Sequence, residues 1–169
     1  MNAKNEFKEA QITPLSEDWL LTAFERFYAT SNAFCVLAST HGYSLSELAV
    51  EVKSSVYPKT FIFLNGAELT GIVRVENPNG TFKSVRIMLD TDANPLATFE
   101  PKDLISYLNC LQNEGFTRIY TYLLTHEENL KLILNECGFN KEALLEEHVF
   151  VNGEYVDLEI WGTSRTNQL

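Results

Sequence analysis

Residues 115–157 hold the most informative pattern in the chain, GFTRIYTYLLTHEENLKLILNECGFNKEALLEEHVFVNGEYVD. Residues 118–124 have the apolar and aromatic content of a strand. Apolar residues then recur at the helical spacing i, i+3, i+4 and i+7, which predicts a helix carrying Leu130, Ile133, Leu134 and Cys137 on one face. Thr125 and Glu128 match a capping box at its start, and Gly138 matches a C-cap at its end.

The end of the chain has the pattern of a β-hairpin. Asn152–Gly153 is the preferred pair for a two-residue type I′ turn. After it, Val156, Leu158 and Ile160 alternate with more polar positions, as expected for a strand with one buried face. We therefore expect two antiparallel strands to close the fold.

The first half of the chain predicts two helices followed by an antiparallel meander. The first helix is capped by Ser16 and the second by Ser44 together with Glu47. A short strand is expected at residues 11–13, and turns are expected at Asn65–Gly66 and at residues 77–80. The predicted meander strands are residues 61–64, 69–75 and 82–89.

A third helix, from Pro101 to before Gly115, connects residues 82–89 with residues 118–124. A strand–helix–strand crossover places its two strands side by side and parallel. The predicted fold is therefore a mixed α/β single domain over residues 1–169. Its central mixed sheet has helices on both faces and a C-terminal hairpin, with loose tails at about residues 1–6 and 164–169.

The net charge of the chain indicates which kinds of molecule are expected as binding partners. The 169 residues include 13 basic and 23 acidic side chains, a formal net charge of -10. No run of Lys and Arg supplies a basic patch, so we expect neither nucleic acid nor a membrane surface as a partner. No segment resembles a membrane span or a signal peptide, which favours a cytoplasmic protein. We expect the three cysteines to be buried thiols, and the widely spaced histidines indicate no metal site.

Residues 115–157 resemble the end of a GNAT-superfamily acetyltransferase of the ribosomal-protein N-acetyltransferase type, an ending shared with bacterial amino-sugar acetyltransferases. The likeness is carried by a capped helix ending in Gly138–Phe139, then a hydrophobic strand, Asn152–Gly153, Tyr155 and Asp157 at the family's spacing. It implies acetyl transfer from acetyl-CoA, as co-substrate, to a primary amine on a small molecule or peptide. A homodimer is an open option.

The resemblance also implies where the site lies. In this fold the two parallel strands part at their C-terminal ends, and exposed backbone groups bind the pantetheine arm of the donor. The amides of Met88 and Leu89 are the candidates here for binding the donor and polarising its carbonyl group. Asn129 is a candidate cofactor contact, although it lies two residues from the family's Asn position, which Glu127 occupies.

Other side chains near the predicted opening are candidates for proton transfer and acceptor binding. His126 and Asp90 each follow one of the two parallel strands and are candidate bases. Glu127, His148 and Tyr155 are candidate contacts of the amine substrate. Each also has an ordinary structural explanation: a solvated first turn of a helix for His126, a turn aspartate for Asp90, and a solvent-facing hairpin for His148.

Two positions differ from the family pattern. The connection between residues 90 and 101 contains no glycine and carries Asp90, Asp92 and Glu100, whereas the family has a glycine-rich loop that binds the pyrophosphate. Leu134 stands where many members carry a tyrosine acid. Two hypotheses therefore remain: an acyltransferase with an unusual donor site, and a non-catalytic binding or assembly module that has lost acetyl-CoA.

Overall fold

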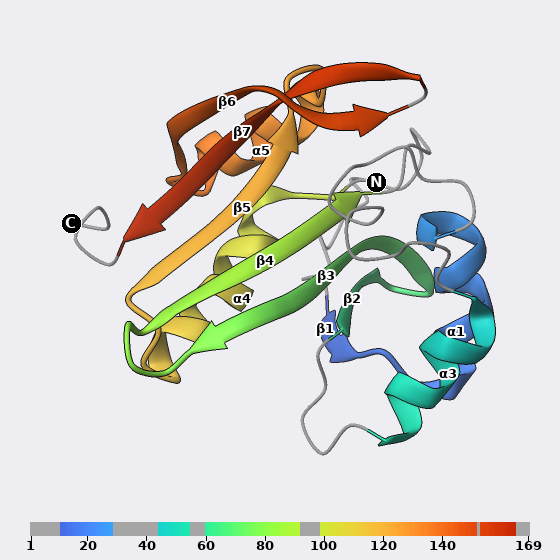
Figure 1. Ribbon diagram of the computed structural model, residues 1–169. Coiled ribbons are helices and arrows are strands. Elements are labelled where there is room, and N and C mark those ends of the chain that lie inside the picture. Colours follow the sequence, from blue (N-terminus) through green and yellow to red (C-terminus); the bar gives the residue numbers. More distant parts are fainter. Residues whose placement is uncertain (1–10, 29–43, 55–59, 92–98, 152, 165–169) are drawn as a thin grey trace, which may run out of the picture.

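The computed structural model describes residues 11–28, 44–54, 60–91, 99–151 and 153–164. Within these ranges a seven-stranded mixed sheet runs in the order β1-β2-β3-β4-β5-β7-β6 (Figure 1). Its strands are β1 Gln11–Pro14, β2 Thr60–Asn65, β3 Glu68–Asn79, β4 Ser84–Thr91, β5 Arg118–Leu124, β6 Asn140–Val151 and β7 Glu154–Ser164.

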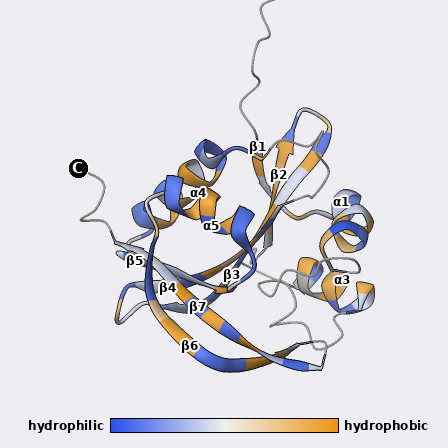
Figure 2. Cartoon of the chain, turned by 90° about the horizontal axis from the view of Figure 1, so that it is seen from above, coloured by the Kyte–Doolittle hydropathy of each residue, from blue (hydrophilic) through white to orange (hydrophobic). Residues whose placement is uncertain are grey.

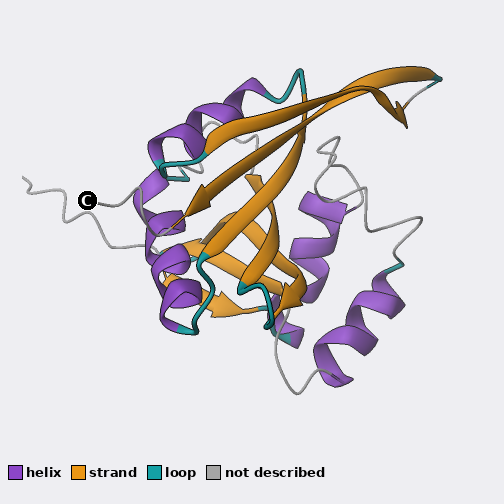
Figure 3. Cartoon of the chain, turned by 60° about the vertical axis from the view of Figure 1, so that its left-hand side comes forward, coloured by secondary structure: helices purple, strands orange, loops and turns teal. Residues whose placement is uncertain are grey.

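The described helices form two groups, one on each side of the sheet. Figures 2 and 3 show α4 and α5 beside one face and α1 and α3 beside the other. The helical segments are α1 Glu17–Ala23, its π-helical continuation η1 Phe24–Tyr28, α3 Leu45–Ser54, α4 Pro101–Asn113 and α5 Glu128–Glu136. The expected mixed α/β fold with helices on both faces is confirmed.

Each helical layer has its own hydrophobic core. On the α4 and α5 side, fully buried residues of the sheet such as Ile87 and Leu89 pack with Leu104, Leu108 and Leu134 of the helices. On the other side, the buried cluster joins the sheet to the α1–η1 segment and α3 through Phe27, Leu48, Ile62 and Ile72. Burial of one such side chain contributes about 1.5–3 kcal/mol, so the two cores hold the helices against the sheet.

Strands β4 and β5 form the parallel pair predicted from the crossover through α4. The other described strand pairs are antiparallel, including the meander β2–β3–β4 and the C-terminal hairpin β6–β7. The early strand at residues 11–13 is also present, as β1, and pairs with β2. The parallel pair therefore joins two antiparallel blocks, β1–β2–β3–β4 and β5–β7–β6.

Two helix ends follow the sequence prediction. Ser44 and Glu47 form the expected capping box, in which the Ser44 N–H donates to Glu47 Oε2 at 2.7 Å and the Glu47 N–H to Ser44 Oγ at 3.3 Å. Gly138 ends α5 with a φ of 82°, a left-handed conformation that favours glycine.

Two other predicted helix starts differ from the structure. Ser16 is the N-cap of α1, but its side chain makes no cap hydrogen bond. The capping box expected from Thr125 and Glu128 does not form either, because Glu127 and not Thr125 is the N-cap of α5. The Glu127 side chain is instead bonded to the end of β5, which places it in the candidate site described below.

Two turns are shifted from their predicted positions. In the β2–β3 hairpin, Asn65 pairs with Glu68, so the turn is Gly66–Ala67 and not Asn65–Gly66. Strand β3 extends to Asn79, and β4 begins at Ser84 instead of residue 82, because Lys83 adopts a left-handed φ of 50° immediately before the strand. The exposed Phe82 therefore lies in the turn.

The cysteines are only partly as expected. Cys137 is buried, and burial, with a smaller contribution from Glu136, raises the pKa of its thiol to about 12. Cys110 is exposed on α4, so its expected burial is wrong. Cys35 lies outside the described residues. In the part of the chain that the structure describes, no helix is both long and apolar enough to cross a membrane.

Replacement of Gly138 tests the end of α5. A Cβ there would lie 3.9 Å from Thr163 Oγ1, so Gly138→Ala introduces no clash and its cost is the left-handed backbone. We expect the free energy of unfolding to fall by about 1 kcal/mol in urea denaturation. Gly80→Ala is the control, because a Cβ at Gly80 would meet no atom within 4 Å and the backbone there is not left-handed. Equal effects of the two substitutions would contradict this assignment.

Candidate functional site

The parallel strands β4 and β5 separate at their C-terminal ends. They pair at Ser84–Arg118, Val85–Ile119 and Arg86–Tyr120, after which the pairing stops. Strand β4 nevertheless continues to Thr91 and β5 to Leu124. Figure 1 shows the two arrows spreading apart toward their tips. The sheet therefore opens in its middle, at the edge where parallel strands end.

Each strand is held apart by its other neighbour. Strand β4 stays paired with β3 as far as Thr91, opposite Gly71. Strand β5 stays paired with β7 as far as Leu124, opposite Leu158. Because both outer ladders continue past the last β4–β5 pair, the opening is a property of the topology and not of a frayed end.

The β4 side of the opening contains Met88, Leu89 and Asp90. Residues in an antiparallel pair alternate between those bonded to the partner strand and those facing away. Of the Met88 and Leu89 amides, one therefore faces β3 and the other faces the opening. The carboxylate of Asp90 is buried at the end of the strand, where Oδ1 accepts the Thr91 N–H at 2.8 Å.

The β5 side of the opening is closed by polar groups from the start of α5. Glu127 Oε2 accepts the Leu124 N–H at 2.6 Å, and Lys131 Nζ donates to the Thr125 carbonyl oxygen. Both backbone groups at the end of β5 are thus bonded within the chain. The two strands therefore differ at the opening. The backbone at the end of β5 is hydrogen-bonded to side chains of Glu127 and Lys131, whereas β4 has a backbone amide directed toward β5.

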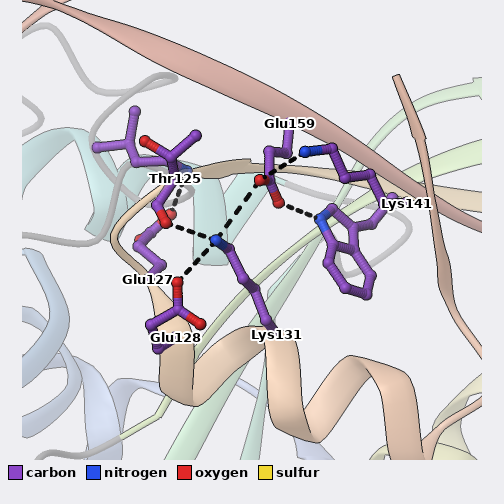
Figure 4. Close-up of polar contacts among 8 residues, drawn as sticks. Thr125, Glu127, Glu128, Lys131, Lys141 and Glu159 are labelled. Carbon is purple, nitrogen blue, oxygen red and sulfur yellow. Dashed lines mark hydrogen bonds and ion pairs between the residues drawn. The ribbon is translucent and has the colours of Figure 1, made fainter. Parts of the chain in front are cut away.

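Lys131 also belongs to a charge cluster centred on Glu159 of β7 (Figure 4). Lys131 Nζ lies 3.5 Å and Lys141 Nζ 2.9 Å from Glu159 Oε1. Trp161 Nε1 donates to Glu159 Oε2 at 2.7 Å. Glu159 is 5% exposed. A single buried carboxylate thus connects α5, β6 and β7. It belongs to the β7 residue that pairs with Leu123, near the end of β5.

The pKa of Glu159 reflects opposing effects. Burial raises it, but the hydrogen bonds from Lys141 and Trp161 and the charges of Lys131 and Lys141 outweigh burial, so the pKa lies below its ordinary value. This cluster is not predicted by the sequence pattern, because alternation along β7 indicates that Glu159 faces solvent. A carboxylate between Leu158 and Ile160 with a nearby tryptophan was the available signal.

The structure brings two groups of predicted site residues to the same edge of the sheet. Met88, Leu89 and Asp90 end β4, and His126 and Glu127 lie between β5 and α5. His126 is exposed. Asn129 is exposed in the first turn of α5, and Leu134 is fully buried in the core. Among the described residues no group of three His, Cys, Asp or Glu side chains is arranged to hold a metal ion.

His148 and Tyr155 lie on the separate β6–β7 hairpin. Both are exposed, and the Tyr155 ring packs against Phe150 with a centroid distance of 5.1 Å. Next to His148, the pairing of β6 with β7 is interrupted between Leu145 and Val149. Glu147 there has a left-handed φ of 47°.

Asp157 stabilises this bulge, because its Oδ1 accepts the Glu147 N–H at 2.8 Å. This contact gives Asp157, part of the sequence resemblance, a structural role. The register shift lies within the β6–β7 hairpin, which extends past the end of β5 (Figure 1).

The chain has the GNAT fold, as comparison with solved structures shows. A spermidine N-acetyltransferase from Vibrio cholerae, solved in complex with CoA and spermine, matches with a TM-score of 0.78 and 16% identity over 94% of this chain and 97% of that one. An N-acetyltransferase from Staphylococcus aureus Mu50 matches with a TM-score of 0.75 and 12% identity over 93% and 99%. No family model and no curated protein matches by sequence. The chain therefore shares with these structures the GNAT fold, a mixed sheet with helices and a C-terminal hairpin.

The Glu159 cluster is testable through its pH dependence. Glu159→Gln removes the charge that neutralises Lys131 and Lys141, and we expect it to lower the free energy of unfolding by about 2 kcal/mol at pH 7. Because the folded-state pKa is depressed, wild-type stability from this group is present above about pH 4.5 and is lost as the pH falls through the folded-state value. The gap between variant and wild type in urea denaturation should therefore shrink below pH 4.5.

Glu128→Gln is the matched control, since Glu128 contacts the same Lys131 at 3.0 Å but its side chain is 72% exposed. We expect it to cost about 0.5 kcal/mol or less. A pH-independent difference for Glu159→Gln would show that the residue acts through packing and not through its charge.

Proposed function

We propose that the protein is an N-acetyltransferase that moves an acetyl group from a pantetheine thioester, acetyl-CoA in the ordinary case, to a primary amine. The observation that carries this proposal is the separation of β4 and β5 beyond Arg86 and Tyr120. Such an opening leaves a strand edge that an extended, amide-bearing arm can pair with, in the manner of β-strand addition.

The pantetheine part of the donor fits the residues present. From Ile87 to Thr91, β3 is the strand neighbour that the described residues give to β4, and we propose that the arm pairs with the other edge of β4. A bound thioester supplies an activated acetyl group at this point. The amide of Met88 or Leu89 that faces the opening would donate to the carbonyl oxygen as negative charge develops on it.

Two side chains are suited to take a proton from the ammonium group of the acceptor, which frees the amine lone pair for attack on the thioester carbonyl. His126 is an exposed imidazole just past the end of β5, and Asp90 is a buried carboxylate at the end of β4. Imidazole is the commonest general base at neutral pH, and Asp90 already accepts the Thr91 N–H, so we propose His126 as the base. Leu134 replaces the tyrosine acid of many GNAT enzymes, so a water molecule would protonate the leaving thiolate.

The acceptor is proposed to be a cationic amine. The net charge of -10 attracts cations, and the structurally similar Vibrio cholerae enzyme was solved with spermine. Glu127 borders the opening, while His148 and Tyr155 lie on the hairpin whose tip extends beyond the same edge (Figure 1). We propose that these three residues contact the acceptor.

A second candidate function is supported by a specific observation. The N-terminus of α4, where a diphosphate would find backbone donors, is capped by Glu100 and Asp103 of the chain itself. Together with the burial of Leu134, this supports a non-catalytic module that retained the fold. The two candidates differ in whether any acetyl thioester binds and is consumed.

Turnover with His126→Ala tests the proposed mechanism. Thiol release from acetyl-CoA is measured with spermidine as acceptor, and we expect kcat to fall about 100-fold because positioned acid–base groups contribute at least that much. Asn135→Ala, an exposed position on the same helix, is the control and should retain wild-type kcat.

Unchanged turnover in His126→Ala would remove this residue from the mechanism and leave Asp90, which Asp90→Asn then tests. If the wild-type protein releases no thiol, and neither acetyl-CoA nor acetyl-pantetheine raises Tm at millimolar concentration, the non-catalytic function replaces the enzymatic one.

A further inference from the structure

We propose, on the basis of the proposed function, that the acyl donor is bound through its pantetheine arm and not through its nucleotide. The donor class is then any acetyl-pantetheine thioester, and the adenosine diphosphate half of acetyl-CoA adds little to binding. This inference comes from the contrast between the two surfaces that an extended donor would meet, the opening between β4 and β5 and the start of α4.

The start of α4 has few backbone donors for a phosphate. A helix N-terminus ordinarily binds phosphate through N–H groups that lack partners within the helix. Here Pro101 has no N–H, the Glu100 N–H donates to Asp103 Oδ2 at 3.4 Å, and the Asp103 N–H donates to the Glu100 carbonyl oxygen at 2.9 Å. In the described part of this helix start, the N–H groups of Glu100 and Asp103 are therefore already bonded within the chain.

The charges at this helix end oppose a diphosphate as well. Glu100 and Asp103 place two carboxylates at the first turn. Lys102 Nζ lies 2.6 Å from Glu100 Oε2, so its charge is already paired with that carboxylate. An anionic ligand at this helix start would have to displace the Lys102–Glu100 pair or lie beside the carboxylates of Glu100 and Asp103.

The opening offers a different kind of contact. Met88 and Leu89 on its β4 side are apolar and buried, and their strand supplies backbone groups for pairing. The pantetheine arm is uncharged and carries two amides, which can pair with strand backbone. This part of the donor neither needs the α4 N-terminus nor is repelled by its carboxylates.

Isothermal titration with three probes tests the inference: acetyl-CoA, acetyl-pantetheine and adenosine 3′,5′-bisphosphate. We expect the two thioesters to have Kd values within ten-fold of each other and the bisphosphate to produce no heat at millimolar concentration. A Kd for acetyl-CoA more than ten-fold below that of acetyl-pantetheine would overturn the inference and leave the proposed function intact. Binding of the bisphosphate alone would also overturn it. If neither thioester binds, the proposed function itself fails.

A variant that removes one negative charge tests whether the start of α4 disfavours binding of the nucleotide half of acetyl-CoA. Glu100→Gln keeps an oxygen at the cap but removes one negative charge, so acetyl-CoA should bind about two- to five-fold more tightly at low ionic strength. The Kd of acetyl-pantetheine should not change. Glu114→Gln, an exposed residue at the other end of α4, is the matched control and should change neither value. An equal change for both thioesters in Glu100→Gln would contradict the assignment.

Discussion

The opening in the sheet depends on which strands β4 and β5 are hydrogen-bonded to along their lengths. Each strand has two edges, and each is committed on its outer edge to an antiparallel ladder that continues to the strand's end. The inner ladder between them stops at Arg86 and Tyr120. Twist accumulates across a sheet, so two antiparallel blocks joined by a short parallel pair separate where that pair ends. The opening is thus a consequence of the strand order.

The two sides of the opening share one apolar core, to which β4 contributes Ile87 and Leu89 and β5 contributes Ile119 and Leu123. Polar contacts are added at the end of β5, where Glu127 and Lys131 bond the backbone and Glu159 connects Lys131 to β7. The β5 side thus carries an ionic network in addition to the apolar core.

Much of the fold was predictable because its signals are local. Helical periodicity located α4 and α5, Ser44 and Glu47 located the start of α3, and the crossover rule placed β4 beside β5. The end of β5 was not predictable in the same way. Thr125 and Glu128 match the sequence pattern of a capping box, but Glu127 is also three residues from a possible partner and bonds reciprocally with Leu124, and the pattern of residue types does not distinguish the two registers. Glu159 shows the same limit, since its burial depends on lysines from two other elements.

The irregular middle of β6 has a consequence for how copies of the protein meet one another. Strand β6 is the outermost strand on its side of the described sheet, and a regular outer strand invites another chain to extend the sheet. Here Glu147 breaks the regular backbone, and the adjacent Glu146 and His148 are exposed and ionisable. An edge strand that is distorted and charged is a poor template for a further strand, so this edge of the sheet disfavours edge-to-edge pairing with another chain.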